Sequence, residues 1–134
     1  MTSFLIEAPD PSDGDGPLAL LKENAVRIFS EPDAGRRLEA LAEIWAPDGV
    51  LVEAEGIAKG YEEIAASVGG LLDVLPPGTS FVPDGQPAGH HGLARMRWRT
   101  ASADGAIGPV SGTDVAIFEK GRIRTLYVII DPAT

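Results

Sequence analysis

Apolar side chains recur every three or four positions through the first part of the chain, the spacing that places them on one face of an α-helix. This spacing predicts a first helix over residues 17–30, with an apolar stripe of Leu18, Leu21, Ala25 and Ile28. A second helix is predicted from Asp33 to Trp45, with the stripe Leu38, Leu41, Ala42 and Trp45. A third is predicted over residues 60–75, with apolar positions at Ile64, Val68, Leu71, Leu72 and Leu75. Three amphipathic helices are therefore expected.

The segment that joins the second predicted helix to the third has the residues of a turn and a short strand. Pro47 cannot extend a helix, and the Asp-Gly pair after it favours a turn. The apolar run over residues 50–52 predicts a short strand, which Glu53 closes. Within the third helix, the adjacent Gly69 and Gly70 predict a bend or the close approach of another backbone.

From Thr79 onward apolar positions alternate with polar ones, which is the pattern of a half-buried β-strand. Strands separated by turns, the first of them interrupted at Pro83, are predicted over residues 79–90, 91–100, 110–118 and 122–130. Helices followed by such a meander predict an α+β fold, with a curved, mainly antiparallel sheet and the helices on one face. Sheets bent in this way commonly leave a pocket between helices and sheet.

The length of 134 residues fits a single domain, which we predict over residues 17–134. Residues 1–16 combine prolines, glycines and acidic residues with few apolar residues after Ile6. Such a segment cannot bury enough apolar surface to offset the entropy of ordering it, so a flexible N-terminal arm is predicted.

Charge and composition exclude several classes of partner. The formal net charge of −9 argues against nucleic acid, because a phosphate backbone is bound by clustered Lys and Arg. No apolar run approaches the roughly 18 residues of a membrane-spanning helix, and the first residues lack the basic flank of a signal peptide. A cytoplasmic protein without nucleic-acid or membrane partners is expected. The sequence has no cysteine, which rules out disulfides and thiolate metal sites.

Arginines alternate with apolar residues along the second long strand. Arg95, Arg97 and Arg99 share one face, because side chains two positions apart in a strand point the same way. They predict a solvated or subunit-facing stripe, with anion recognition as the alternative. Met96 and Trp98 face the other way and are predicted to line the core or a pocket wall.

The two histidines of the chain, His90 and His91, are adjacent, so on a strand they point in opposite directions and at most one faces a pocket. His90 is a candidate base, because the ordinary histidine pKa lies near neutrality, and a surface or interface position is the alternative. Neither histidine has a partner at metal-ligand spacing, so no metal site is predicted.

Two carboxyl groups are candidates for an inward position. Asp114 is in phase with Phe118 and points inward if Phe118 does, and a buried carboxyl needs a partner or a raised pKa. The alternative is a structural polar group that bonds the backbone or a neighbouring strand. Glu53 shares a face with Leu51, which permits an inward direction, although a glutamate at the end of a strand is more often solvated.

Three passages of the chain resemble the NTF2-like superfamily, the cone-shaped α+β fold shared by nuclear transport factor 2, ketosteroid isomerase and the SnoaL-like polyketide cyclases. They are residues 45–53, Gly60 at the start of a helix, and residues 112–123, and the resemblance covers residues 17–131. It implies a pocket for a small apolar or aromatic molecule and no cofactor. The superfamily includes enzymes, carriers and non-catalytic binding proteins, so it does not identify a reaction.

Residue by residue, the resemblance places Glu53 at the general base of ketosteroid isomerase. It places Asp114 at the protonated aspartate of the oxyanion hole, four residues before an aromatic that Phe118 matches. In such a pair one ionised carboxylate abstracts a proton next to a carbonyl, and the neutral one donates a hydrogen bond to the enolate. The isomerase has a second donor, a tyrosine on its first helix, where this chain offers Asn24, Phe29 and Ser30. Tyr61 and Tyr127 are the candidates to replace that tyrosine.

Two hypotheses follow. The first is a SnoaL-like protein that binds a small apolar or aromatic molecule, with cofactor-independent isomerase or cyclase-type acid and base chemistry by Asp114, Glu53 and His90. Its pocket is predicted to be lined by Trp98, Met96, Phe118, Tyr61 and Phe29. The second is a non-catalytic ligand-binding or dimerisation module, which the absent tyrosine favours. A homodimer through the open sheet face is also predicted, because Leu93 points outward with the arginines and sheets of this superfamily tend to pair.

Overall fold

The structure, a computed structural model, describes residues 15–132. The first helix, α1 (Asp15–Glu23), continues directly into the π-helical turn η3 (Asn24–Phe29), and α2 (Ala34–Ile44) and α3 (Gly60–Val74) follow. The three predicted helices are therefore present. None of the helices within the described range is long and apolar enough to cross a membrane. The arm predicted over residues 1–16 lies, except for its last two residues, outside the described part of the chain.

Two side chains fix helix ends. Asp33 caps α2, and its Oδ2 accepts a hydrogen bond from the backbone N–H of Arg36 at 2.8 Å. Ser30 follows η3, where its Oγ donates to the carbonyl of Ala25 at 2.7 Å and accepts from the backbone N–H of Phe81 at 2.8 Å. Ser30 thus holds the end of η3 against the segment that carries Phe81.

Within the described residues, seven strands form one mixed sheet: β1 (Trp45–Glu53), β2 (Gly56–Lys59), β3 (Ser80–Pro83), β4 (Ala88–His90), β5 (Leu93–Ala101), β6 (Ile107–Glu119) and β7 (Arg122–Ile130). Their order is β2-β1-β7-β6-β5-β3, with β4 paired to β5. All neighbouring strands are antiparallel except β1 and β7, which run parallel. The predicted α+β class is confirmed.

The sheet differs from the prediction in two places. The strand predicted over residues 79–90 divides into β3 and β4, and β2, which was not predicted, forms a hairpin with β1. In addition, β1 begins at Trp45 and not at Val50, so Trp45 starts a strand where the end of a helix was predicted. A register shift against β7 between these two residues accommodates Pro47 and the turn residues after it as a bulge.

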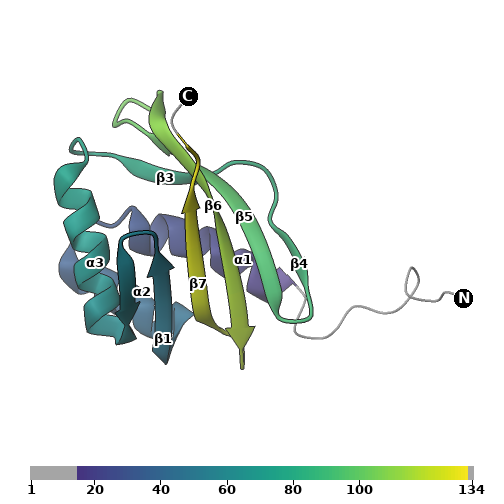
Figure 1. The fold of residues 1–134 in the computed structure, drawn as a ribbon. Coiled ribbons are helices and arrows are strands. Elements are labelled where there is room, and N and C mark those ends of the chain that lie inside the picture. Colours follow the sequence, from purple (N-terminus) through teal and green to yellow (C-terminus); the bar gives the residue numbers. More distant parts are fainter. Residues whose placement is uncertain (1–14, 133–134) are drawn as a thin grey trace, which may run out of the picture.

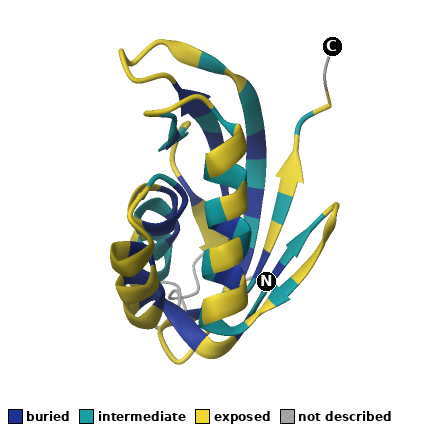
Figure 2. Cartoon of the chain, turned by 90° about the vertical axis from the view of Figure 1, so that its left-hand side faces the viewer, coloured by how far each residue is buried: buried dark blue, intermediate teal, exposed yellow. Residues whose placement is uncertain are grey.

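The helices lie together on one face of the sheet, which curls around them (Figure 1). Figure 2 shows buried residues gathered where helices and sheet face each other, and exposed residues on the outer sides of both layers. On β5 to β7 this division follows the alternation of the strands, with Met96, Ala116 and Leu126 inside and Arg95, Ile117 and Tyr127 outside. The arginines of β5 therefore belong to the outer face.

Trp45 lies in the core, as predicted, and is fully buried. Its indole Nε1–H donates a hydrogen bond to Oδ1 of Asn24 at 2.8 Å, and its backbone carbonyl accepts one from the Tyr61 hydroxyl at 2.8 Å. Asn24 and Tyr61 are thereby committed to holding this tryptophan between helices and sheet. Neither side chain therefore replaces the tyrosine that ketosteroid isomerase has on its first helix as a hydrogen-bond donor.

The first glycine of the pair in α3, Gly69, lies against an arginine and not against another backbone. Arg37 is buried, and its guanidinium donates to the carbonyls of Glu31, Pro32 and Ala65 at 2.9 to 3.3 Å. A Cβ on Gly69 would lie 2.9 Å from Nη1 of Arg37, whereas none of the neighbouring atoms comes within 4 Å at Gly70. Gly69 therefore makes room for a guanidinium that ties the start of α2 to α3.

Candidate functional site

A cavity of about 350 Å³ lies between the helices and the inner face of the sheet. Most of its wall is apolar, and the aromatic part is made of Phe29, Phe81 and Trp98. The Phe81 ring meets both others edge to face, with centroids 5.8 Å from Phe29 and 5.2 Å from Trp98. Polar groups are few, namely the carboxyls of Glu53, Glu55 and Asp114 and the hydroxyls of Ser67 and Thr100.

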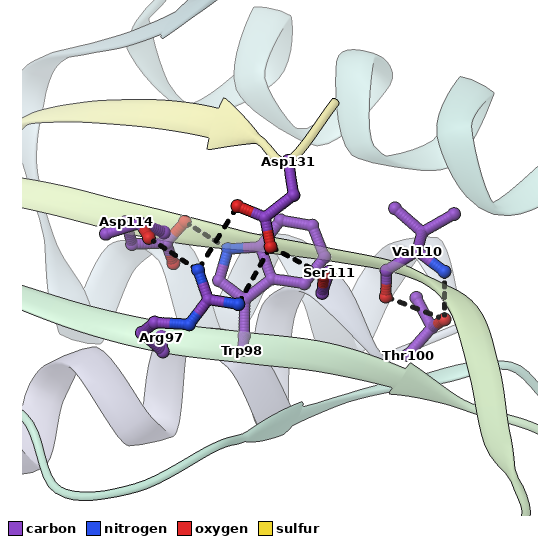
Figure 3. Close-up of polar contacts among 8 residues, drawn as sticks. Arg97, Trp98, Thr100, Val110, Ser111, Asp114 and Asp131 are labelled. Carbon is purple, nitrogen blue, oxygen red and sulfur yellow. Dashed lines mark hydrogen bonds and ion pairs between the residues drawn. The ribbon is translucent and has the colours of Figure 1, made fainter. Parts of the chain in front are cut away.

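Asp114 is the most deeply placed of these carboxyls. It lies in the middle of β6, between Met96 on β5 and Val128 on β7, and only 5% of its surface is exposed. Its Oδ1 accepts a hydrogen bond from the indole Nε1–H of Trp98 at 2.9 Å (Figure 3). Burial away from water raises the pKa of Asp114 from 3.8 to about 7; the Trp98 bond works against this rise, and the charge of Glu53 adds to it.

A glycine allows Trp98 to reach this carboxyl. Trp98 on β5 is directly opposite Gly112 on β6, two residues before Asp114. A Cβ on Gly112 would lie 2.5 Å from Cζ2 of the indole, so a larger residue would displace the ring. The indole therefore lies over Gly112 and forms part of the cavity wall. Figure 3 shows it beside Asp114.

Glu53 faces the same cavity from β1. Val52 pairs with Tyr127 of β7, so the next step of the parallel register sets Glu53 beside Val128, which pairs in turn with Asp114. The two carboxyls thus share one face two strands apart, with about 10 Å between their Cα atoms. The Oε1 of Glu53 accepts a hydrogen bond from the Ser67 hydroxyl of α3 at 3.0 Å.

The structure brings four of the eight predicted site residues to the cavity: Asp114, Glu53, Trp98 and Phe29. Their chemical roles remain predictions. The remaining four lie elsewhere.

Met96, predicted to line the pocket, is fully buried in the core between sheet and helices. Phe118 lies nearer the end of β6, beside a small depression next to Pro17, and Tyr61 is bonded to the backbone of Trp45. His90 is exposed on β4, with its Nδ1 3.0 Å from Nδ1 of the adjacent His91. Inward direction alone does not distinguish cavity wall from core, since Met96 and Trp98 both point inward from β5 and Trp98 lines the cavity whereas Met96 does not.

The sequence did not single out the cavity's two hydroxyls or Glu55. The inward position of Thr100 could have been predicted, since Thr100 continues the inward alternation of Met96 and Trp98. Its Oγ1 donates to the carbonyl of Val110 at 3.1 Å. Both lining hydroxyls thus already donate their protons, and Phe29 has none to give. Among the described residues of the cavity wall, a protonated Asp114 is then the group with a free proton to donate.

Within residues 15–132 no three His, Asp or Glu side chains are grouped so that they could hold a metal ion. A family model described as the SnoaL-like domain matches residues 23–126, most of the chain. The chain belongs to the SnoaL-like domain family. This family is part of the NTF2-like superfamily, and the predicted membership is confirmed. No curated protein is similar enough to count as a match.

Solved structures share the fold of this SnoaL-like chain. A crystal structure of a candidate isomerase of the SnoaL-like family from Agrobacterium tumefaciens is 28% identical, with 88% of this chain and 99% of that chain covered and a TM-score of 0.79. A candidate SnoaL-like polyketide cyclase from Jannaschia sp. CCS1 is 12% identical over 93% and 91% of the two chains, with a TM-score of 0.68. An NTF2-like protein of unknown function from Mesorhizobium loti is 19% identical over 93% and 98%, with a TM-score of 0.65.

Proposed function

We propose that this protein binds an apolar carbonyl compound in its cavity and moves a proton at the carbon next to the carbonyl, as a cofactor-independent isomerase or cyclase would. The observation that carries the proposal is the environment of Asp114: a carboxyl 5% exposed, in an apolar cavity, beside a second carboxyl on the same face. The similarity to a candidate isomerase and a candidate cyclase supports the same reaction class.

The two carboxyls have different surroundings, which assigns them different roles. Since the Trp98 indole donates to Oδ1 of Asp114, the proton of the neutral acid belongs on Oδ2. That O–H can donate to the carbonyl oxygen of a ligand and stabilise negative charge as it develops there. Glu53 is half-buried, and Ser67 occupies its Oε1, so Oε2 can accept the proton that leaves the adjacent carbon. Return of that proton to another carbon of the conjugated enolate gives an isomer. Attack of the enolate carbon on a second carbonyl of the same molecule gives a ring, as the π bond of that carbonyl opens to an alkoxide that takes the proton back from Glu53.

The proposal is tested by deuterium exchange. A panel of apolar ketones is incubated with the protein in deuterated water, and exchange next to the carbonyl is followed by mass spectrometry. We expect catalysed exchange that falls by about a hundredfold or more in Glu53→Gln, in line with the contribution of a general base. A Glu62→Gln variant, which removes an exposed carboxylate from the first turn of α3, is the matched control. Equal exchange in wild type and Glu53→Gln would contradict the assignment.

One observation favours a second candidate, a non-catalytic binding module. Phe29 stands in the cavity wall on the first helical segment, where ketosteroid isomerase has a tyrosine, and the Ser67 and Thr100 hydroxyls donate elsewhere. A single hydrogen-bond donor would then stabilise the enolate. Ligands that bind beside Trp98 and show no catalysed exchange would support this second function.

We further propose that two copies pair through the outer face of the sheet. Large apolar side chains are exposed there, among them Leu93, Ile117, Tyr127 and Ile129, with exposures of 43 to 55%. Leu93 and Ile117 are direct cross-strand partners, so the patch is continuous over β5 and β6. Sedimentation should give a dimer at micromolar concentration that Tyr127→Asp converts to monomer. Val74→Asp, at a still more exposed apolar position on α3, is the control, and a monomeric wild type would disprove this pairing.

A further inference from the structure

The cavity wall carries acidic groups and no basic one. Asp114, Glu53 and Glu55 line it, and Lys, Arg and His are absent from the described residues that do so. The arginines of β5 alternate with the inward side chains and belong to the outer face, where Arg97 pairs with Asp131 at 2.8 Å. The negative charge of the cavity is therefore not balanced from within the fold.

Glu55 is the acid at the mouth of the cavity. It lies in the two-residue turn between β1 and β2, where it is exposed, and it takes part in none of the hydrogen bonds or ion pairs found among residues 15–132. The same hairpin presents Glu53 on the cavity side, at the last residue of β1. Glu55 thus contributes charge at the entrance and has no part in holding the fold.

Part of the same wall is aromatic. Phe29, Phe81 and Trp98 line it in an edge-to-face cluster, and aromatic faces of this kind attract cations as well as apolar groups. A carboxylate or phosphate ligand would meet uncompensated negative charge in a partly desolvated space, whereas a protonated amine would find both carboxylates and aromatic faces.

We propose that the ligand of this cavity carries a protonated amine on an apolar body, with the ammonium group at Glu55, and that anionic ligands are excluded. The inference rests on the proposed function only in that it uses the same cavity. Glu55 acts here as a residue that selects the ligand by charge. The proton-transfer chemistry stays with Glu53 and Asp114.

Three probes of nearly equal shape test the charge preference: phenethylamine, phenethyl alcohol and phenylacetate. Binding is followed through the indole N–H signal of Trp98 in nitrogen-proton NMR spectra, with that of Trp45, bonded to Asn24 in the core, as internal reference. At low salt we expect the amine to bind about tenfold more tightly than the alcohol, and phenylacetate about tenfold more weakly, as a partly exposed charge pair allows. Added salt should narrow both differences.

Two variants test whether Glu55 is the residue responsible for the preference for the amine over the alcohol. Glu55→Gln should lower the ratio of amine to alcohol affinity about fivefold or more, whereas Glu62→Gln on the exposed side of α3 should leave that ratio unchanged. Phenylacetate binding as tightly as the amine, or an unchanged ratio in Glu55→Gln, would overturn the inference while leaving ligand binding in place. If none of the three probes moves the Trp98 signal, the inference fails, whereas the proposed function is decided separately by the deuterium exchange of apolar ketones.

Discussion

Replacing Asp114 by Asn should make the protein more stable at neutral and alkaline pH. In the folded protein the pKa of Asp114 is raised from 3.8 to about 7, chiefly because burial disfavours the charged form. Between these two values the unfolded chain has released a proton that the folded chain still holds. Stability contributed by this group is therefore fully present below about pH 4, is lost as the pH rises toward 7, and changes no further above that.

The size of the effect follows from the two pKa values. A difference of about three pKa units corresponds to about 4 kcal/mol of unfolding free energy, since one unit is worth about 1.36 kcal/mol. Asn is nearly isosteric with Asp and keeps an oxygen that can accept the hydrogen bond of Trp98, so both the packing and this hydrogen bond are retained. The variant should match wild type near pH 4 and exceed it by roughly 4 kcal/mol at pH 8.

Urea unfolding at a series of pH values between 4 and 8 measures this difference directly. Asp73→Asn, which removes an exposed carboxylate from α3, is the matched control and should show no comparable gain. A constant difference between Asp114→Asn and wild type across the series would refute the reasoning, because it would mean that Asp114 ionises in the folded protein as it does in the unfolded chain.

The remaining predictions concern the scaffold. Gly69→Ala should destabilise the fold by about 1 to 3 kcal/mol in urea unfolding, because its Cβ would lie 2.9 Å from the Arg37 guanidinium, whereas Gly70→Ala should be neutral or stabilising by up to about 1 kcal/mol. Asp131→Asn should lower stability at pH 7 and lose that effect as the pH falls toward 2, because hydrogen bonds from Arg97 and Ser111 lower the Asp131 pKa from 3.8 to about 2. Equal unfolding midpoints for the two glycine variants, or an Asp131 effect independent of pH, would contradict these expectations.

Much of the fold was accessible from the sequence because its signals are local. The three helices follow from apolar spacing and from stops such as Pro76, and the long strands follow from alternation. The strand β2 could not be predicted in this way, since Gly56–Lys59 has one exposed edge and too little apolar surface to show alternation. The parallel pairing of β1 with β7 joins segments about seventy residues apart and has no local signature.

The candidate site was partly predictable for the same reason. Strand phase with Phe118 and Leu51 indicated that Asp114 and Glu53 face inward. Strand phase could not separate Met96 from Trp98, because both point inward from β5. Met96 is enclosed by the core, whereas Trp98 reaches the cavity because Gly112 leaves room for its ring. The contribution of Glu55 depends on a hairpin turn, which only the three-dimensional path of the chain brings to the cavity mouth.

The protonation state of Asp114 decides whether its carboxyl can donate a hydrogen bond inside the cavity, and with a pKa of about 7 the carboxyl is about half protonated at neutral pH. Carbon-13 NMR titration of its side-chain carboxyl, assigned with Asp114→Asn, measures that state directly. A midpoint near pH 7 is predicted, which should rise further in Trp98→Phe, because the indole hydrogen bond favours the charged form, and stay unchanged in Trp45→Phe. A midpoint close to the ordinary aspartate value of 3.8 would contradict the account.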